Sequence, residues 1–409
     1  MKLVEGDAPY DTKVITTNLK TSLSTVNCQL STINYLTMFQ SFFMGGFECS
    51  THRVQSGKRL DVTAATGHDK FAVADYQRLQ DQGIYTVREG LRWHLIEQSP
   101  GKYDFSSSLP IIRAARDMKM QVIWDLFHYG WPDDIDIFSP EFVSRFANMV
   151  RAFMEVLTEE TDQTPFVTPV NEISFIAWAG GEVAYINPFA KGRGDELKTQ
   201  LIKAAIAAIE SVWEVNPNTR IVQIDPVINI IADPDKPEDR DAAEGYRLSQ
   251  YQAWDMLAGR FRPELGGKEK YLDIIGLNYY DRNQWIHNEE PMKYTDPLYR
   301  PFSELLREVF ERYGRPLFIA ETGTEDDFRP VWFNYVCTEV AAAMQAGVPI
   351  DGVCLYPIVN HPGWDDDRHC YNGLWDYCDE KGDREIYQPL ADELQFQRQQ
   401  IEPLLKLKN

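Results

Sequence analysis

The sequence has no excess of positive charge and no long apolar run. It carries 41 Lys and Arg residues against 62 Asp and Glu residues, which gives a formal net charge of −21. A surface with this charge repels phosphate backbones and anionic membranes, so we expect no nucleic-acid partner and no membrane binding. No stretch approaches the roughly 18 consecutive apolar residues that a membrane-spanning helix needs.

Cysteine is scarce, with 6 residues in a chain of 409. Disulfide frameworks are typical of small secreted domains, whereas a chain of this length with 44% hydrophobic residues can bury a large core without cross-links. The first residues show no basic segment followed by an apolar run, as a signal peptide would. We therefore expect free thiols and a location in the cytoplasm.

The chain also lacks the glycine-rich first turn that marks a dinucleotide-binding sheet. It has instead a regular alternation of short apolar runs and amphipathic helical stretches. The apolar runs are flanked by Gly, Pro, Asn or Asp. We predict strands at Phe42–Ser50, Tyr85–Trp93, Gln121–His128, Phe166–Asn171, Ile221–Val227, Ile274–Tyr280, Leu317–Glu321 and Gly352–Ile358. Helical spacing is clearest at Asp69–Gln82, Pro140–Leu157, Asp195–Val215 and Phe328–Ala346.

This alternation predicts an α/β fold, a single (β/α)₈ TIM barrel over residues 38–409. Parallel neighbours need long return connections, and eight strand–helix units can close on themselves. Residues 1–37 show no sustained period, and we expect them to form an N-terminal extension that is weakly ordered or packed on the barrel. The longest irregular stretches follow predicted strands, where a barrel carries its active-site loops.

Polar side chains end most of the predicted strands. In a barrel these ends meet at one rim, so the side chains would converge. The alternative is that strand ends are simply where the chain meets water, although convergence from several strands is harder to explain in that way. The strand-end residues that we single out as candidates are Arg88, His128, Asn171, Glu172, Asn278, Tyr280 and Glu321.

Two of these residues, Glu172 and Glu321, form a candidate catalytic pair because they end the fourth and the seventh strands. Opposed carboxylates suit glycoside hydrolysis, in which one protonates the leaving oxygen and the other attacks or stabilises the anomeric carbon. Retention requires the two carboxyl groups to be about 5–5.5 Å apart. A nearby carboxylate would raise the pKa of Glu172 and so suit it to the acid role.

The strand-end motifs resemble those of the family 1 glycoside hydrolases, the β-glucosidase and β-galactosidase family, over about residues 42–364. The segment Pro169-Val170-Asn171-Glu172-Ile173 is similar to the family's acid/base motif, and Ile319-Ala320-Glu321-Thr322-Gly323 to its nucleophile motif. The resemblance therefore implies a retaining β-glycosidase that needs no cofactor, with Glu172 as acid/base, Glu321 as nucleophile and a carbohydrate or glycoside as substrate.

Other strand ends add to the resemblance and assign supporting roles. Tyr280, in a Gly-hydrophobic-Asn-Tyr-Tyr segment with Asn278, would hydrogen-bond the nucleophile. Arg88 stands five residues before a tryptophan, as in the family, and His128 would bind a sugar hydroxyl. Asn171 would contact the 2-hydroxyl of the sugar, a contact that strengthens in the transition state.

The sequence departs from the family where the glycone, the sugar on the non-reducing side of the cleaved bond, is recognised. His52 occupies the first-strand position of a sugar-binding glutamine. In the eighth strand Tyr356 replaces a tryptophan, and Gly363-Trp364 replaces a Glu-Trp pair. We therefore expect the bond-breaking residues to be retained and the glycone site to be altered, with His52, Tyr356 and Trp364 as candidate contacts.

Other acidic residues in the sequence have simpler explanations than catalysis or metal binding. The acidic run from Trp364 to Cys370 has no zinc-ligand spacing, and we expect a solvated loop and no metal site. Glu48 and Glu89 also lie near strand ends, and we expect structural hydrogen bonding from both. A transglycosidase, or a sugar-binding barrel without turnover, is the alternative function.

Overall fold

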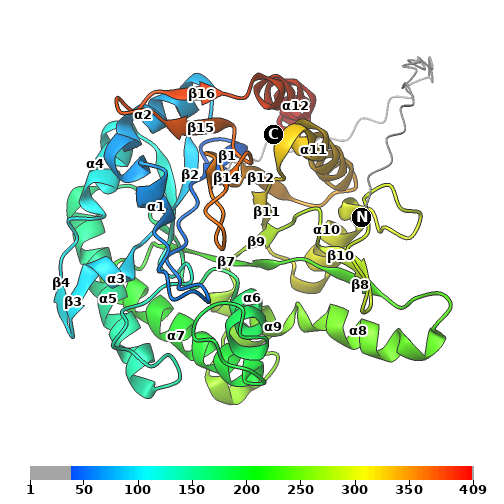
Figure 1. The fold of residues 1–409 in the computed structure, drawn as a ribbon, viewed down its shortest axis with the longest axis horizontal. Helices are drawn as coiled ribbons and strands as arrows, with labels where there is room; N and C mark the ends of the chain where they lie inside the picture. The colour runs from blue at the N-terminus through cyan, green and yellow to red at the C-terminus, as the bar shows by residue number, and fades with distance from the viewer. Residues whose placement is uncertain (1–37, 408–409) are drawn as a thin grey trace, which may run out of the picture. The chain divides into compact units, whose positions relative to one another are not determined.

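The central feature of the computed structural model, which describes residues 38–407, is a closed barrel of parallel strands (Figure 1). Gly45 and Gly46 of the first strand lie opposite Leu355 and Arg88 of its two neighbours, which closes the barrel. The strands are β1 (Phe43–Gly46), β2 (Thr86–Gly90), β5 (Gln121–Asp125), β6 (Phe166–Thr168), β7 (Arg220–Pro226), β9 (Ile274–Asn278), β11 (Leu317–Thr322) and β12 (Ile350–Leu355). Each predicted strand overlaps one of these, so the prediction of a (β/α)₈ barrel is confirmed. The expected N-terminal extension, residues 1–37, lies outside the described residues.

Helices connect successive barrel strands on the outside of the barrel, and a last helix follows β12 (Figure 1). They are α1 (Val62–Ala65), α2 (His68–Asp81), α3 (Trp93–Ile96), α4 (Leu109–Asp117), α5 (Pro140–Glu160), α6 (Ile173–Ile176), α7 (Gly194–Val215), α8 (Arg240–Ser249), α9 (Gln252–Leu257), α10 (Phe302–Tyr313), α11 (Arg329–Gln345) and α12 (Gln388–Leu407). The four stretches with the clearest helical spacing correspond to α2, α5, α7 and α11. Between residues 38 and 407, no helix is both long and apolar enough to cross a membrane.

The loops after the barrel strands contain short strand pairs that the sequence pattern did not predict. Their members are β3 (Glu97–Ser99) with β4 (Lys102–Tyr103), β8 (Asn229–Ile231) with β10 (Gln284–Ile286), β13 (His361–Pro362) with β14 (His369–Cys370), and β15 (Trp375–Cys378) with β16 (Arg384–Ile386). The pair β8–β10 is parallel and joins the loops that follow β7 and β9. Strands of two to four residues are too short to show a clear period, so they emerge only from tertiary contacts.

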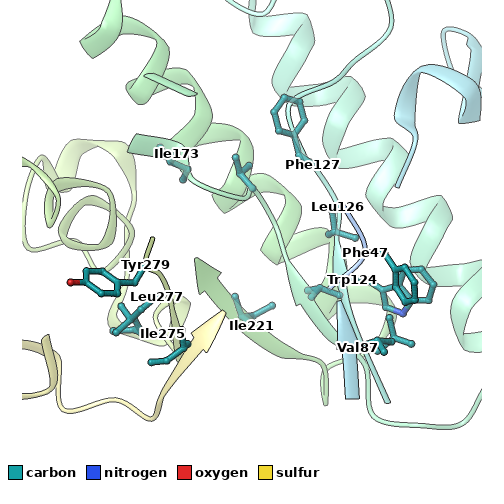
Figure 2. Close-up of a cluster of buried hydrophobic side chains, with 14 of the residues drawn as sticks. Phe47, Val87, Trp124, Leu126, Phe127, Ile173, Ile221, Ile275, Leu277 and Tyr279 are labelled. Carbon is teal, nitrogen blue, oxygen red and sulfur yellow. The ribbon is translucent and has the colours of Figure 1, made fainter. Parts of the chain in front are cut away.

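The hydrophobic core has two layers because side chains alternate along each strand. Outward-facing residues pack between the strands and the helices, as Figure 2 shows for Val87, Trp124, Ile221, Ile275 and Leu277. A smaller cluster forms the other layer. Its residues on the barrel strands are Met44, Ile123, Phe166, Val222, Ile224, Ile274, Phe318, Ala320 and Cys354. These residues alternate with outward-facing ones and therefore fill the barrel interior.

The same alternation decides which strand-end side chains face the barrel axis. On β9, Ile274 belongs to the inner cluster and Ile275 to the outer one, so Asn278 faces inward. On β11, simple alternation would place Glu321 on the outer side with Ile319. The register with β9 shifts between these two residues, which redirects the glutamate toward the barrel axis.

Candidate active site

Arg88 lies at the centre of a buried hydrogen-bond network at the C-terminal ends of the strands. Its Nη1 donates to Glu321 Oε1 at 2.9 Å, and its Nη2 donates to Asp125 Oδ2 at 2.6 Å and to Asn171 Oδ1 at 3.1 Å. The side chain is fully buried, and a buried guanidinium is stable only when charges of opposite sign face it. Arg88 therefore fixes three strand ends relative to one another.

Glu321 is held by donors on both of its carboxylate oxygens. Tyr280 donates from its hydroxyl to Oε2 at 2.8 Å, while Asn171 Nδ2 donates to Oε1 at 3.3 Å, the same oxygen that Arg88 contacts. Only 4% of the residue is exposed. Because both oxygens are held, the carboxylate keeps one orientation at the end of β11.

Glu172 has a different environment, made of neutral donors. Asn278 Nδ2 donates to its Oε1 at 2.9 Å, and the Tyr129 hydroxyl donates to its Oε2. Burial raises the pKa of Glu172 to about 8, the charge of Glu321 adds to this effect, and the two hydrogen bonds oppose it. A carboxyl group with this pKa keeps its proton at neutral pH and can donate it.

The two glutamates line a single cavity of about 1260 Å³. They are also linked through two side chains. Tyr129 donates to Glu172, and Asn171 Nδ2 donates both to the Tyr129 hydroxyl, at 3.1 Å, and to Glu321. The arrangement therefore places one neutral and one charge-paired carboxyl group on the wall of the same space.

The backbone at Glu172 is in the left-handed region, with φ at 52°. This conformation is unfavourable for a residue other than glycine, so the surrounding contacts must hold it. The Glu172 N–H donates to Ile224 O at 3.0 Å. Asp225 accepts hydrogen bonds from the backbone N–H and the hydroxyl of Ser174, at 3.1 and 2.9 Å. Burial raises the pKa of Asp225 to about 7 although these hydrogen bonds oppose it.

Three of the residues predicted to contact sugar line the cavity: His128, Tyr356 and Trp364. His128 is 2% exposed, and its Nδ1 lies 3.1 Å from Asp125 Oδ2, which orients the ring. Tyr356 packs over β1, where a Cβ at Gly46 would lie only 2.0 Å from the tyrosine ring. The ring therefore requires a glycine at that position. Whether these three residues bind sugar stays a prediction.

Like Asn171, His52 is a sugar-contact candidate that the structure does not place among the described cavity-lining residues. Its ring is fully buried and packs edge-on against Trp364, with the ring centroids 4.5 Å apart. Burial lowers the pKa of His52 to about 3, so the ring is neutral. His52 therefore packs against a cavity-lining ring, and a direct contact between His52 and sugar stays a prediction.

The sequence pattern did not mark Tyr129 or Glu48 as a functional candidate. Tyr129 follows His128 directly, but its left-handed backbone, with φ at 71°, and its hydrogen bond to Glu172 have no sequence signal. Glu48 lines the cavity from the loop after β1. Glu89 behaves as expected, since it accepts hydrogen bonds from His68 Nε2 at 2.9 Å and from the Tyr76 hydroxyl at 2.7 Å.

One group of residues could offer metal ligands in the part of the chain that the structure describes. Ligand atoms of Cys49, Asp125 and His128 lie within 4.8 Å of one another. However, Arg88 donates to the same Asp125 oxygen that His128 contacts. A guanidinium at this distance neutralises the carboxylate and repels a cation, so the group is better suited to positioning His128 than to binding a metal.

Comparison with known proteins gives a structural match and no sequence match. No family model matches the chain, and no curated protein does. Among solved structures, a β-glucosidase from Thermotoga maritima in complex with glucoimidazole has a TM-score of 0.73 at 15% sequence identity, covering 90% of this chain and 99% of that one. The chain shares the fold of family 1 β-glucosidases.

A second structure agrees with the first. It is described as a family 1 β-glucosidase from Thermotoga maritima, and it has a TM-score of 0.71 at 16% identity over 88% of this chain and 97% of that one. The match therefore extends over nearly the whole length of both proteins. At this level of identity the match concerns the fold, and the chemistry has to be argued from the side chains.

Proposed function

We propose that this chain is a retaining β-glycosidase that hydrolyses O-glycosidic bonds through a covalent glycosyl-enzyme intermediate. One observation carries the proposal: two glutamates line one cavity, and their surroundings differ. Glu321 is paired with the Arg88 guanidinium, whereas Glu172 receives neutral donors and has a raised pKa. Retaining glycosidases need this combination of a nucleophile and a protonated acid.

In the first step a Glu321 oxygen attacks the anomeric carbon while Glu172 gives its proton to the departing oxygen. The bond to the aglycone breaks, the aglycone leaves as an alcohol, and the sugar remains esterified to Glu321. In the second step Glu172, now a carboxylate, takes a proton from water. The water oxygen attacks the anomeric carbon, which frees Glu321 and restores the proton of Glu172.

The neighbouring side chains suit this sequence of steps. Tyr280 and Arg88 hold the nucleophile from two directions, and Asn171 bridges it to the acid/base through Tyr129. We assign Asn171 to the 2-hydroxyl and His128, Tyr356 and Trp364 to the glycone. The solved neighbours carry ligands such as glucoimidazole and deoxynojirimycin, which agrees with a carbohydrate or glycoside substrate for this chain.

The stereochemistry of the product tests the proposal directly. We expect hydrolysis of an aryl β-glycoside to release the β-anomer first, because two inversions at the anomeric carbon give net retention. Proton NMR of the anomeric signals in the first minutes of the reaction measures this before mutarotation. Release of the α-anomer first would contradict the covalent intermediate, and the absence of release from any aryl glycoside would favour the sugar-binding alternative.

A transglycosidase would use the same two glutamates and differ only in the acceptor. The cavity extends to the partly exposed Trp178 and Tyr246, 44% and 39% exposed, where either an aglycone or an acceptor sugar could stack. Competition between water and an added sugar acceptor, followed by product analysis, distinguishes the two activities. Location in the cytoplasm, like the absence of a nucleic-acid partner, stays a prediction from the sequence.

Replacement of Tyr129 by Phe tests how the pKa of Glu172 is set. The Tyr129 hydroxyl donates to Glu172 and lowers its pKa, so its removal should raise that pKa. We expect the alkaline limb of kcat/KM to move to higher pH by roughly one to two pH units, the equivalent of one hydrogen bond to a charged group. A pH–rate profile measures the shift.

Tyr279→Phe provides the matched control for this measurement. The Tyr279 hydroxyl lies 2.6 Å from the Tyr299 hydroxyl and contacts neither glutamate, so its loss should leave the alkaline limb in place. A Tyr129→Phe profile that overlays the wild-type profile would exclude a role for the hydroxyl in setting the pKa.

A further inference from the structure

Glu48 places a carboxylate in the buried part of the cavity. It stands two residues after the end of β1, lines the cavity and is 8% exposed. Ser50 is the one described residue that donates a hydrogen bond to it, from its backbone N–H to Oε1 at 3.1 Å. An ionised carboxylate can accept about four hydrogen bonds, so most of its capacity is left for a molecule in the cavity.

This carboxylate remains ionised despite its burial. Burial alone would raise the pKa of Glu48, but the nearby His128 and His361 side chains, together with hydrogen bonding from Ser50, more than compensate and lower it. His361 lines the cavity together with His128. No Lys or Arg side chain forms an ion pair with Glu48 among the described residues. A buried anion with unused acceptor capacity is costly unless its ligand supplies donors.

The charge of Glu48 acts on the same groups that hold the catalytic pair. It contributes to raising the pKa of Tyr129, which contacts Glu172, and of Tyr280, which contacts Glu321. It acts in the same way on Tyr356. Glu48 lines the same cavity as Glu172 and Glu321, and its charge acts on side chains that contact both of them.

The cavity has a second part that differs in exposure and in composition. Trp178 and Tyr246 are partly exposed there, and Lys198 Nζ contacts Gln252 Oε1 at 2.8 Å. A terminal sugar is recognised best where polar side chains are buried, because an unpaired buried group penalises the wrong ligand. We therefore assign the buried part near Glu48 to the glycone and the exposed part to the aglycone.

We propose that Glu48 determines the class of glycone, accepting hydrogen bonds from hydroxyl groups of a neutral sugar and repelling sugars that carry a carboxylate or a phosphate. The inference rests on the proposed glycosidase function. Glu48 would also give the glycone a carboxylate from the loop after β1, although Gly363 stands where the family has a glutamate after the eighth strand.

A comparison of charged and uncharged glycones tests this assignment. The substrates are 4-nitrophenyl β-D-glucoside, galactoside, fucoside, xyloside and mannoside, with 4-nitrophenyl β-D-glucuronide as the anionic glycone. For the wild-type chain we expect at least one neutral glycoside to exceed the glucuronide in kcat/KM by about 10- to 100-fold, the range for loss of a hydrogen bond to a charged group. Equal or faster turnover of the glucuronide would overturn the assignment without any variant.

Glu48→Gln keeps the shape of the side chain and removes its charge. We expect kcat/KM on the best neutral glycoside to fall by about 10- to 100-fold, and the value on the glucuronide to stay unchanged or to rise. The ratio of the two values should therefore shrink by at least about tenfold. Both kcat/KM values come from one preparation. A misfolded fraction therefore lowers both by the same factor and leaves their ratio unchanged.

Glu89→Gln is the matched control, since Glu89 is a buried carboxylate near the end of β2 that bonds His68 and Tyr76 and is not a cavity-lining residue. Its ratio should equal that of the wild type. An unchanged ratio in Glu48→Gln would overturn the role of Glu48. Failure of the wild type to hydrolyse any of the six glycosides, the glucuronide included, would instead count against the proposed function.

Discussion

Glu321→Ala should abolish hydrolysis of aryl β-glycosides. Without the carboxylate the covalent intermediate cannot form, and the Arg88 guanidinium and the Tyr280 hydroxyl lose the group that they hold. Loss of a catalytic nucleophile typically lowers kcat by about 10⁴-fold or more. Release of nitrophenolate under saturating substrate measures the loss.

Azide distinguishes a missing nucleophile from a disrupted site. A small anion can enter the space left by the Glu321 side chain and attack the anomeric carbon from the same face. We expect azide to restore release of the aglycone and to yield an α-glycosyl azide, because a single inversion replaces two. Product NMR identifies the anomer, and a β-glycosyl azide would assign the nucleophile to another residue.

Glu325→Ala is a suitable control because Glu325 follows the same strand. Its carboxylate pairs with Arg368 at 2.6 Å, and it is not among the residues that line the cavity. Its loss should leave kcat close to that of the wild type. Full activity in Glu321→Ala without azide would end the assignment of this residue.

The sequence predicts the barrel well because each strand carries a strong local pattern. Apolar runs bounded by turn residues mark all of the barrel strands, and amphipathic spacing marks the longer helices. Polar residues at strand ends also converge as expected, since the direction of parallel strands sends them to one rim. Arg88, Asn171, Asn278 and Tyr280 all lie in the network around the two glutamates.

The rest of the site depends on tertiary geometry that no local pattern encodes. Glu321 faces the cavity because β11 shifts register against β9, which alternation alone would not predict. Tyr129 reaches Glu172 from a left-handed backbone at a residue other than glycine. Glu48 follows the end of β1, where the period of two no longer applies. In each case contacts with neighbouring segments of the protein, rather than the local sequence pattern, decide where the side chain lies.

Glu172→Gln should separate substrates by their leaving groups. A departing alkoxide with a high pKa needs a proton, whereas 4-nitrophenolate and especially 2,4-dinitrophenolate leave without one. We expect kcat/KM to fall by about 10²- to 10⁴-fold for alkyl glycosides and far less for 2,4-dinitrophenyl glycosides. Equal losses across the series would argue against an acid role for Glu172.

The pH profile gives a second readout of the same residue. Glu172 donates a proton in the first step, so activity requires its protonated form, which is present below its pKa and lost as the pH rises through about 8. The wild-type kcat/KM should therefore fall on the alkaline side near that pH. Glu172→Gln should lack this limb, because glutamine does not titrate.

Azide completes the comparison of the two glutamates. In Glu172→Gln the nucleophile is intact, so the glycosyl-enzyme forms and azide attacks it in place of water. Two inversions then give a β-glycosyl azide, the opposite anomer from that expected with Glu321→Ala. Opposite anomers from the two variants require the two carboxyl groups to act on one anomeric carbon from different sides. The same anomer from both would contradict that arrangement, even if each variant had lost activity.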